Sequence, residues 1–239
     1  MNEPAARPAG HGLRLGLAWA VHCYTAFGAV LGFVALERVF AGDHRTAFAL
    51  LAAALLIDAS DGAFARAVGV RKLIPWIDGE VLDNLVDYLN YVVAPVAVLA
   101  QPGVLPAGAW PVPLLVLLAS AYGFSRTDAK GMVEHYFRGF PSYWNVVAFY
   151  FVVLDTPPGF NLAVLLVLLG LVFVPMRWLY PSRMERFRTT TLLLGLPWAA
   201  MGVVLIARLP EPSPLLGLVS LFYPLYYTVG SVVFHFRSA

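Results

Sequence analysis

Four aspartates stand in two pairs at helical spacing within residues 57–93. Asp58 and Asp61 are three residues apart, and Asp83 and Asp87 are four residues apart. Residues at these spacings share a face of an α-helix, so each pair presents two carboxylates in one direction. If the two helices are antiparallel neighbours, the four carboxylates converge.

Such a group of carboxylates predicts a bound cation, because like charges at short range in a low-dielectric site repel strongly. Residues 57–93 contain no histidine or cysteine, and hard divalent cations prefer oxygen ligands. We therefore expect magnesium or manganese, with two ions bound. Ions of this kind usually engage phosphate oxygens as well.

Small residues accompany the aspartates. Gly62 and Gly79 lie next to or near them, and Ala65 follows one turn after Asp61. Glycine weakens a helix unless something must approach the backbone closely, so a nucleotide or phosphate fits there, and the Arg66 guanidinium suits a phosphate or a carboxylate. The alternatives are that the small residues allow tight helix packing and that the aspartates form a proton relay or interhelical salt bridges.

The elements that carry these residues are membrane helices by composition. The chain is 60% hydrophobic and 13% charged, with a mean hydropathy of +0.74, whereas soluble domains are about a quarter charged. We expect an all-α, polytopic membrane helix bundle that forms a single domain over residues 1–239. Apolar runs of about 20 residues predict eight transmembrane helices, at approximately 14–38, 46–70, 77–100, 106–126, 141–156, 160–180, 188–208 and 213–236.

The fifth of these runs is the weakest, because it is short and the link at residues 155–159 separates it from the sixth. A re-entrant hairpin there would reduce the count. The formal net charge of +2 is too small to suggest a nucleic-acid partner. Cys23 is the single cysteine, so the chain has no internal disulfide.

Lysine and arginine concentrate in alternate loops, those that follow the second, fourth and sixth predicted spans. By the positive-inside rule these loops face the cytoplasm, and so do both termini. The carboxylates then lie at the cytoplasmic ends of the second and third spans, within reach of cytosolic metal and nucleotide. The loop residues are Arg66, Arg71, Lys72, Arg126, Lys130, Arg138, Arg177, Arg183, Arg186 and Arg188.

The pattern Asp58-x2-Asp61-Gly62-x2-Ala65-Arg66 followed by Gly79-x3-Asp83-x3-Asp87 resembles the signature of the CDP-alcohol phosphotransferases. These membrane enzymes transfer a substituted phosphate from a CDP-linked donor to an alcohol and release CMP. Twelve residues separate Arg66 from Gly79, where most of the family has eight. The longer spacer, the eight predicted spans and the run Gly139-Phe-Pro-Ser-Tyr-Trp-Asn145 are similar to a bacterial subgroup that condenses CDP-diacylglycerol with free choline.

The resemblance implies an enzyme of the bacterial inner membrane whose active site faces the cytoplasm and forms phosphatidylcholine and CMP. Its partners would be CDP-diacylglycerol, choline and membrane lipids, with Mn²⁺ or Mg²⁺ as cofactor and a homodimer as the expected assembly. Asp58, Asp61 and Asp83 would bind the metals, and Asp87 would be a further ligand or the general base. The CDP portion would lie against Asp58, Gly62, Ala65, Arg66 and Gly79. Relatives that use serine, inositol or glycerol phosphate as acceptor are the alternative.

Choline recognition predicts aromatic side chains, because a quaternary ammonium offers no hydrogen-bond donor and binds aromatic faces. Tyr91 lies one turn beyond Asp87, which places it on the same helical face. The other side chains that could contribute are Tyr88, Trp19, His22, Tyr24, Tyr143, Trp144 and Asn145.

Each of these side chains also has a structural explanation. Tryptophan and tyrosine form the interfacial belt of membrane proteins, Asn145 could join helices, and His22 and His135 could be hydrogen-bonded packing residues. Glu80 could be a solvent-facing acid or the anionic partner of choline. A cation transporter is less consistent with the sequence, because the acids lie near one surface and no paired broken helices are evident. A lipid scaffold gives no reason for the ordered acid pairs.

Overall fold

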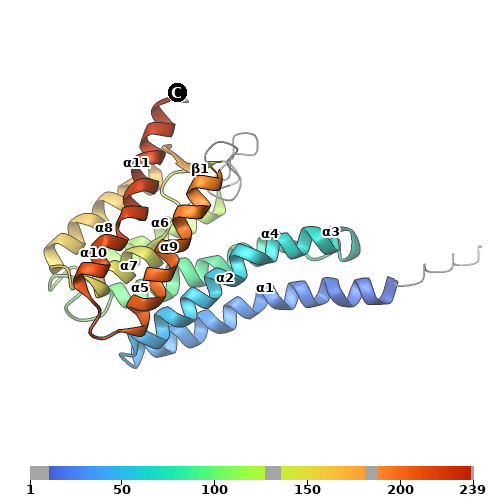
Figure 1. Ribbon diagram of the computed structural model, residues 1–239, viewed down its shortest axis with the longest axis horizontal. Helices are drawn as coiled ribbons and strands as arrows, with labels where there is room; N and C mark the ends of the chain where they lie inside the picture. The colour runs from blue at the N-terminus through green and yellow to red at the C-terminus, as the bar shows by residue number, and fades with distance from the viewer. Residues whose placement is uncertain (1–10, 127–135, 181–187, 238–239) are drawn as a thin grey trace, which may run out of the picture.

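The computed structural model describes residues 11–126, 136–180 and 188–237, most of which are helical. The helices α1 (His11–Phe40) and α2 (His44–Val68) run antiparallel, and with α4 (Gly79–Asp87) they extend away from the remaining helices (Figure 1). The residues Lys130, His135, Arg183 and Arg186 of the sequence argument lie outside the described residues.

Local capping defines the ends of the helices that carry the aspartates. Asp43 begins α2 by accepting a 3.0 Å hydrogen bond from the Thr46 amide, as expected for an N-cap. Gly69 ends α2 in the left-handed conformation, at φ 77°, and donates its amide to the Ala65 carbonyl, a common helix C-terminus. After the short α3 (Val70–Leu73), Asp78 caps α4 (Gly79–Asp87). These turns bring α4 back against α1.

The helix after α4 is wound as a π-helix. α4, η1 (Tyr88–Val93) and α5 (Ala94–Leu99) form one continuous helix, in which the Ala94 amide bonds the Leu89 carbonyl five residues earlier. Pro95 has no amide hydrogen for the α-helical pattern, and the Asn90 side chain donates to the Val86 carbonyl at 2.9 Å. A proline and a side chain inserted into the helical hydrogen-bond ladder both interrupt the regular α-helical pattern. The wide turn therefore begins directly after Asp87.

Two glycines of α1 allow close packing against the end of α4 and the π-helix that follows it. A Cβ added to Gly28 would lie 2.7 Å from Val86 Cγ1, and one added to Gly32 would lie 2.7 Å from Asn90 Oδ1. The Asn90 amide also donates to the Gly28 carbonyl at 3.1 Å. These contacts hold α1 against the helix that carries Asp87.

The rest of the described chain forms a cluster of shorter helices and one small ribbon (Figure 1). The ribbon pairs β1 (Tyr136–Arg138) with β2 (Arg177–Leu179) in antiparallel register and was not predicted from the sequence. The helices are α6 (Pro111–Ser125), α7 (Trp144–Val153), α8 (Pro158–Phe173), α9 (Arg188–Ala207), α10 (Pro214–Ser220) and α11 (Phe222–Arg237).

The prediction of a membrane helix bundle is confirmed, and each of the eight predicted spans contains a helix. Within the described residues, five helical segments are long and apolar enough to cross a membrane: Gly12–Phe40, His44–Val68, Gly79–Leu99, Arg188–Ala207 and Pro214–Arg237. The helices α6, α7 and α8 are shorter. The predicted sixth span, 160–180, was too long, because α8 ends at Phe173 and the chain continues into β2.

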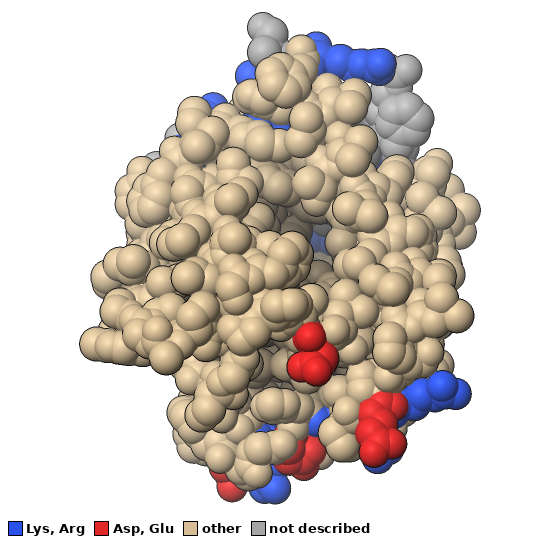
Figure 2. Space-filling model, turned by 90° about the vertical axis from the view of Figure 1, so that its left-hand side faces the viewer, with Lys and Arg blue, Asp and Glu red and all other residues tan. Residues whose placement is uncertain are grey.

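The surface agrees with a lipid environment. Figure 2 shows charged side chains gathered toward the upper and lower ends of one face, with mostly uncharged residues between them. Large apolar side chains such as Phe33, Leu56 and Leu193 are 60% to 70% exposed. Contiguous exposed apolar surface of this kind is rare in soluble monomers and is what contact with lipid requires.

Candidate metal centre

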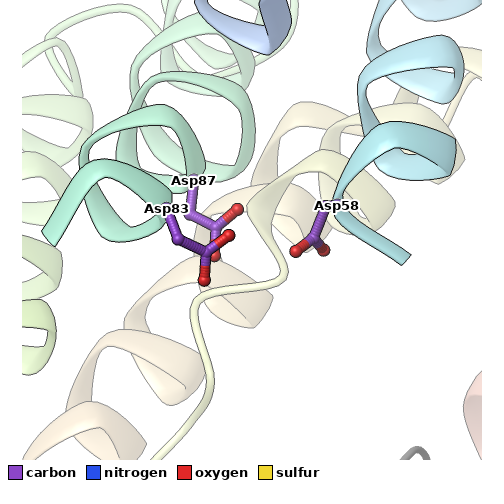
Figure 3. A group of neighbouring side chains, drawn as sticks. All are labelled: Asp58, Asp83 and Asp87. Carbon is purple, nitrogen blue, oxygen red and sulfur yellow. The ribbon is translucent and has the colours of Figure 1, made fainter. Parts of the chain in front are cut away.

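Three of the four predicted carboxylates converge in the structure. Asp58 extends from α2, Asp83 and Asp87 extend from α4, and their side chains point toward one another (Figure 3). One oxygen from each lies within 4.8 Å of the others, and all three residues are half-buried. We call Asp58, Asp83 and Asp87 the carboxylate triad. The predicted convergence of carboxylates from the two helices is confirmed for these three residues.

The carboxylate triad fits a hard divalent cation. Three carboxylates at this separation repel one another in a partly dry site, and a cation removes that cost. The donor atoms are all oxygens, which Mg²⁺ and Mn²⁺ prefer. Mg²⁺ in particular is usually held by a few carboxylates together with phosphate oxygens of a substrate. The triad could therefore bind a metal ion and a phosphate-bearing substrate together.

Asp61 lies outside the triad. It is buried, and its Oδ2 accepts a 2.7 Å hydrogen bond from the Thr25 hydroxyl of α1. Successive helical residues turn by about 100°, so Asp61 lies about 60° around the helix from Asp58, while Asp83 and Asp87 differ by only about 40°. This geometry directs Asp61 toward α1. Its predicted metal-binding role remains a prediction, and the bond to Thr25 was not foreseen.

Tyr91 contacts the triad directly. Its hydroxyl donates a 2.6 Å hydrogen bond to Asp58 Oδ2. Its ring meets the edge of Tyr143, with centroids 6.5 Å apart, and Tyr143 in turn meets Tyr227 at 5.7 Å. Tyr91, Tyr143 and Tyr227 thus form a row of aromatic rings, which we call the tyrosine row, that begins at the triad.

Tyr227 is the member of the tyrosine row that the sequence analysis missed. It lies on α11, about 80 residues along the chain from Tyr143, and its hydroxyl donates to the Leu179 carbonyl at 2.9 Å. No motif or spacing links it to the aspartates, so only the folded arrangement reveals the contact.

Other predicted choline residues make contacts of a structural kind. The Tyr88 hydroxyl donates to the Leu117 carbonyl at 2.9 Å. Trp144 is fully buried, and its indole N–H donates to Ser120 Oγ at 2.8 Å. These bonds engage the polar atoms of Tyr88 and Trp144 in joining helices.

The run Gly139–Asn145 forms the connection that positions Tyr143. Gly139 has φ 86°, and a Cβ there would lie 2.5 Å from the Val172 carbonyl oxygen, so only glycine fits. Asn145 Oδ1 accepts from the adjacent Val146 amide. Within this run, Tyr143 is the residue that belongs to the tyrosine row.

The glycines of the motif differ from the packing glycines of α1. A Cβ on Gly79 would meet only His22 Cε1, at 3.6 Å, an ordinary contact, and Gly79 is exposed. A Cβ on Gly62 would have Arg66 Nη1, the end of a flexible side chain, as its nearest neighbour at 3.2 Å. The surroundings of Gly79 are therefore open, which favours approach of a ligand over tight helix packing, whereas the flexible side chain of Arg66 lies over Gly62.

The remaining motif and acceptor residues have simpler surroundings. Ala65 is half-buried and packs against the buried cluster around Ala18 on α1, so the packing explanation describes it. Arg66 and Glu80 are exposed, the latter in the first turn of α4. Trp19 is 43% exposed on α1.

Comparison with known proteins gives a consistent set of relatives. No known family profile matches the chain. It is 38% identical over 214 residues to a phosphatidylcholine synthase of Legionella pneumophila, which covers 86% of this chain and 84% of the relative. It is 36% identical over 200 residues to that of Pseudomonas aeruginosa, covering 83% and 84%. It is 33% identical over 230 residues to that of Borreliella burgdorferi, covering 95% and 97%.

Proposed function

The chain belongs to the phosphatidylcholine synthase family, and we propose that it transfers the phosphatidyl group of CDP-diacylglycerol to choline, giving phosphatidylcholine and CMP. The carboxylate triad is the observation that carries this proposal, since phosphoryl transfer to an alcohol needs charge neutralisation and a base at one place. The similarity to the choline-using subgroup, first identified from the spacer and the motif, is confirmed by these relatives.

The triad would hold divalent metal, with two ions of Mg²⁺ or Mn²⁺ and Asp61 as a further ligand. Such ions neutralise a diphosphate and make CMP a competent leaving group. The observations that support this assignment are the all-oxygen donor set and the 4.8 Å grouping. The Tyr91 hydroxyl orients the Asp58 carboxylate, as outer hydrogen bonds commonly orient metal ligands.

The donor nucleotide would lie along the open surface beside Gly62 and Gly79. The open surroundings of Gly79 support this placement, and at Gly62 the nearest neighbour is the flexible end of Arg66. Arg66, which folds over Gly62, would place its guanidinium against the donor phosphates, a pairing suited to its fork geometry. The donor then extends from the exposed start of α4 toward the triad.

Asp87 would act as the general base. An alcohol is a weak nucleophile at neutral pH, so a positioned carboxylate that accepts the choline hydroxyl proton speeds its attack on phosphorus. Asp87 is the triad residue at the junction with η1, four residues before Tyr91. A proton acceptor there lies between the donor surface and the tyrosine row.

The choline ammonium would rest against the tyrosine row. Aromatic faces attract a quaternary ammonium, and the nearby carboxylates add a negative field. The contact of Tyr91 with both Asp58 and Tyr143 supports this placement. The same surroundings would repel an anionic acceptor such as glycerol phosphate.

We propose an inner-membrane location with both termini and the triad on the cytoplasmic side. Ten residues of α7 rise only about 15 Å, half of the roughly 30 Å hydrocarbon core. A topology with eight spans therefore needs part of residues 139–143 to complete the fifth crossing. If α7 and α8 instead form a re-entrant pair, the protein has six spans. Both counts place the termini on one side. Cysteines introduced at Lys72 and Gly103 should label from opposite sides, and labelling from the same side would contradict this topology.

The acceptor is tested by supplying purified protein with CDP-diacylglycerol, Mn²⁺ and one labelled alcohol at a time. Choline should enter lipid, while serine, inositol and glycerol phosphate should not. A main product from another alcohol would replace choline as the acceptor. Cross-linking in the membrane tests the expected homodimer, and an exclusively monomeric species would contradict it.

A further inference from the structure

His22 is a buried histidine with an unused nitrogen. It lies on α1, is 7% exposed, and its Nε2 has no hydrogen-bond partner among the described residues. Buried polar atoms are almost always paired, and an unpaired one calls for an explanation such as a bound molecule. The ring edge faces the space at Gly79, where an added Cβ would lie 3.6 Å from His22 Cε1.

The level of His22 in the bundle identifies what it would meet. Thr25, one turn further along α1, bonds Asp61, and Gly79 lies one turn before Asp83 on α4. His22 and Gly79 therefore face each other one to two helical turns, roughly 6–12 Å, to the cytoplasmic side of the triad. A diphosphate held at the triad leaves its attached nucleoside at this level.

We propose that His22 recognises the nucleoside of the donor, with Nε2 hydrogen-bonded to the ribose or the cytosine in the space that Gly79 leaves open. The inference rests on the proposed function, because it assumes a CDP-linked donor. Both parts of the nucleoside offer donors and acceptors, and imidazole Nε2 can serve as either. Gly79 and His22 then have complementary roles, since Gly79 leaves space for the nucleoside and His22 supplies the polar contact.

Binding of CMP, measured by titration calorimetry on the full-length protein with Mn²⁺, tests the proposal against inorganic diphosphate as a ligand without a nucleoside. His22→Phe should weaken CMP binding roughly 3- to 10-fold, the loss of one hydrogen bond. Diphosphate binding and the choline KM should not change. His22→Gln, whose amide reaches the Nε2 position, should restore most of the CMP affinity. His22→Asn, whose shorter amide does not reach it, should bind CMP as weakly as His22→Phe. The Gln and Asn pair tests the hydrogen bond even if the phenylalanine variant folds poorly.

His44 provides a matched control, because its Nε2 is also buried with no hydrogen-bond partner in the described part of the chain, and it lies at the start of α2, far from the triad. His44→Phe should leave CMP binding unchanged. Equal losses of CMP and diphosphate binding in His22→Phe would overturn the proposal, as would unchanged CMP binding. If the unaltered protein neither binds CMP nor forms lipid, the proposed function fails as well. If it does both and His22→Phe matches it, only the role of His22 fails.

Discussion

The hydroxyl of Tyr91 donates a 2.6 Å hydrogen bond to Asp58 Oδ2, which joins η1 to α2 across 33 residues of sequence. The same side chain meets Tyr143 through its ring. Tyr91 thus has two separable parts, a hydroxyl that bonds Asp58, which we propose as a metal ligand, and a ring that contacts Tyr143, beside the proposed choline site. Substitutions can remove one part at a time.

Tyr91→Phe removes the hydroxyl and keeps the ring. We expect the Mn²⁺ concentration for half-maximal activity to rise about 10- to 100-fold, as for other hydrogen bonds that orient metal ligands, with the choline KM unchanged. Tyr91→Ala should also raise the choline KM, by the worth of a cation–π contact of about 0.5–2 kcal/mol. An unchanged metal dependence in Tyr91→Phe would separate Asp58 from metal binding. An unchanged choline KM in Tyr91→Ala would move the ammonium away from the tyrosine row.

Gly79→Ala tests whether the open surface binds the donor. The protein leaves room for the methyl group, so thermal unfolding should stay near that of the unaltered protein. The KM for CDP-diacylglycerol should rise, because the added methyl group would occupy the space proposed for the nucleotide. Unchanged donor kinetics would place the nucleotide elsewhere.

Gly32→Ala is the matched comparison for Gly79→Ala. Its methyl group would collide with Asn90 Oδ1 at 2.7 Å and with Leu89 at 2.9 Å. We expect a loss of about 1–3 kcal/mol in stability, as for other overpacked sites, measured by thermal or denaturant unfolding. Equal stability of the two alanine variants would contradict the distinction between packing glycines and ligand-facing glycines.

The sequence predicted the parts of the site that follow helical spacing. The spacing of Asp83 and Asp87 and the antiparallel return of the chain were enough to anticipate the carboxylate triad. Asp61 shows the limit of such reasoning. Because it is three residues from Asp58, its side chain points about 60° away around the helix and can contact a different neighbouring helix. The contact is the hydrogen bond from the Thr25 hydroxyl of α1 to Asp61, and nothing in the sequence indicated that α1 would place a hydroxyl there.

The structure also departs from regular helical geometry where the sequence was read as regular. Pro95 and the Asn90 side chain both interrupt the regular hydrogen-bond pattern at the π-helix, and Asn90 also bonds the Gly28 carbonyl of α1. The β1–β2 ribbon pairs residues about 40 apart, and apolar runs alone carry no signal for such pairing. The β2 strand therefore appeared as the end of a span.

Asp61→Asn separates a metal ligand from a structural carboxylate. Asparagine keeps an oxygen that can accept the Thr25 hydroxyl, so the unfolding temperature should change little, while CMP release should be abolished if Asp61 binds metal. Thr25→Val should show the opposite pattern: the unfolding temperature should fall, because the buried Asp61 carboxylate loses its partner, while CMP release should continue. Full activity in Asp61→Asn would limit Asp61 to its bond with Thr25.

Asp87→Asn separates the base from a metal ligand. The variant keeps one carbonyl oxygen but cannot accept the proton, so kcat should fall about a hundredfold to ten-thousandfold. Binding of CMP with Mn²⁺, measured by calorimetry, should survive because the other aspartates remain. A loss of CMP and metal binding in proportion to the loss of activity would make Asp87 a ligand and leave the base to be found elsewhere.

The most direct test of the account is incorporation of labelled choline into lipid by the purified protein and by Asp83→Asn, with CDP-diacylglycerol present and divalent metal first removed by a chelator. We predict that the unaltered protein forms labelled lipid and CMP in equal amounts only after Mg²⁺ or Mn²⁺ is restored. Asp83→Asn should form neither product while remaining folded in the membrane. Labelled lipid formed without metal, or at a near-normal rate by Asp83→Asn, would contradict a metal-dependent carboxylate triad at the centre of this reaction.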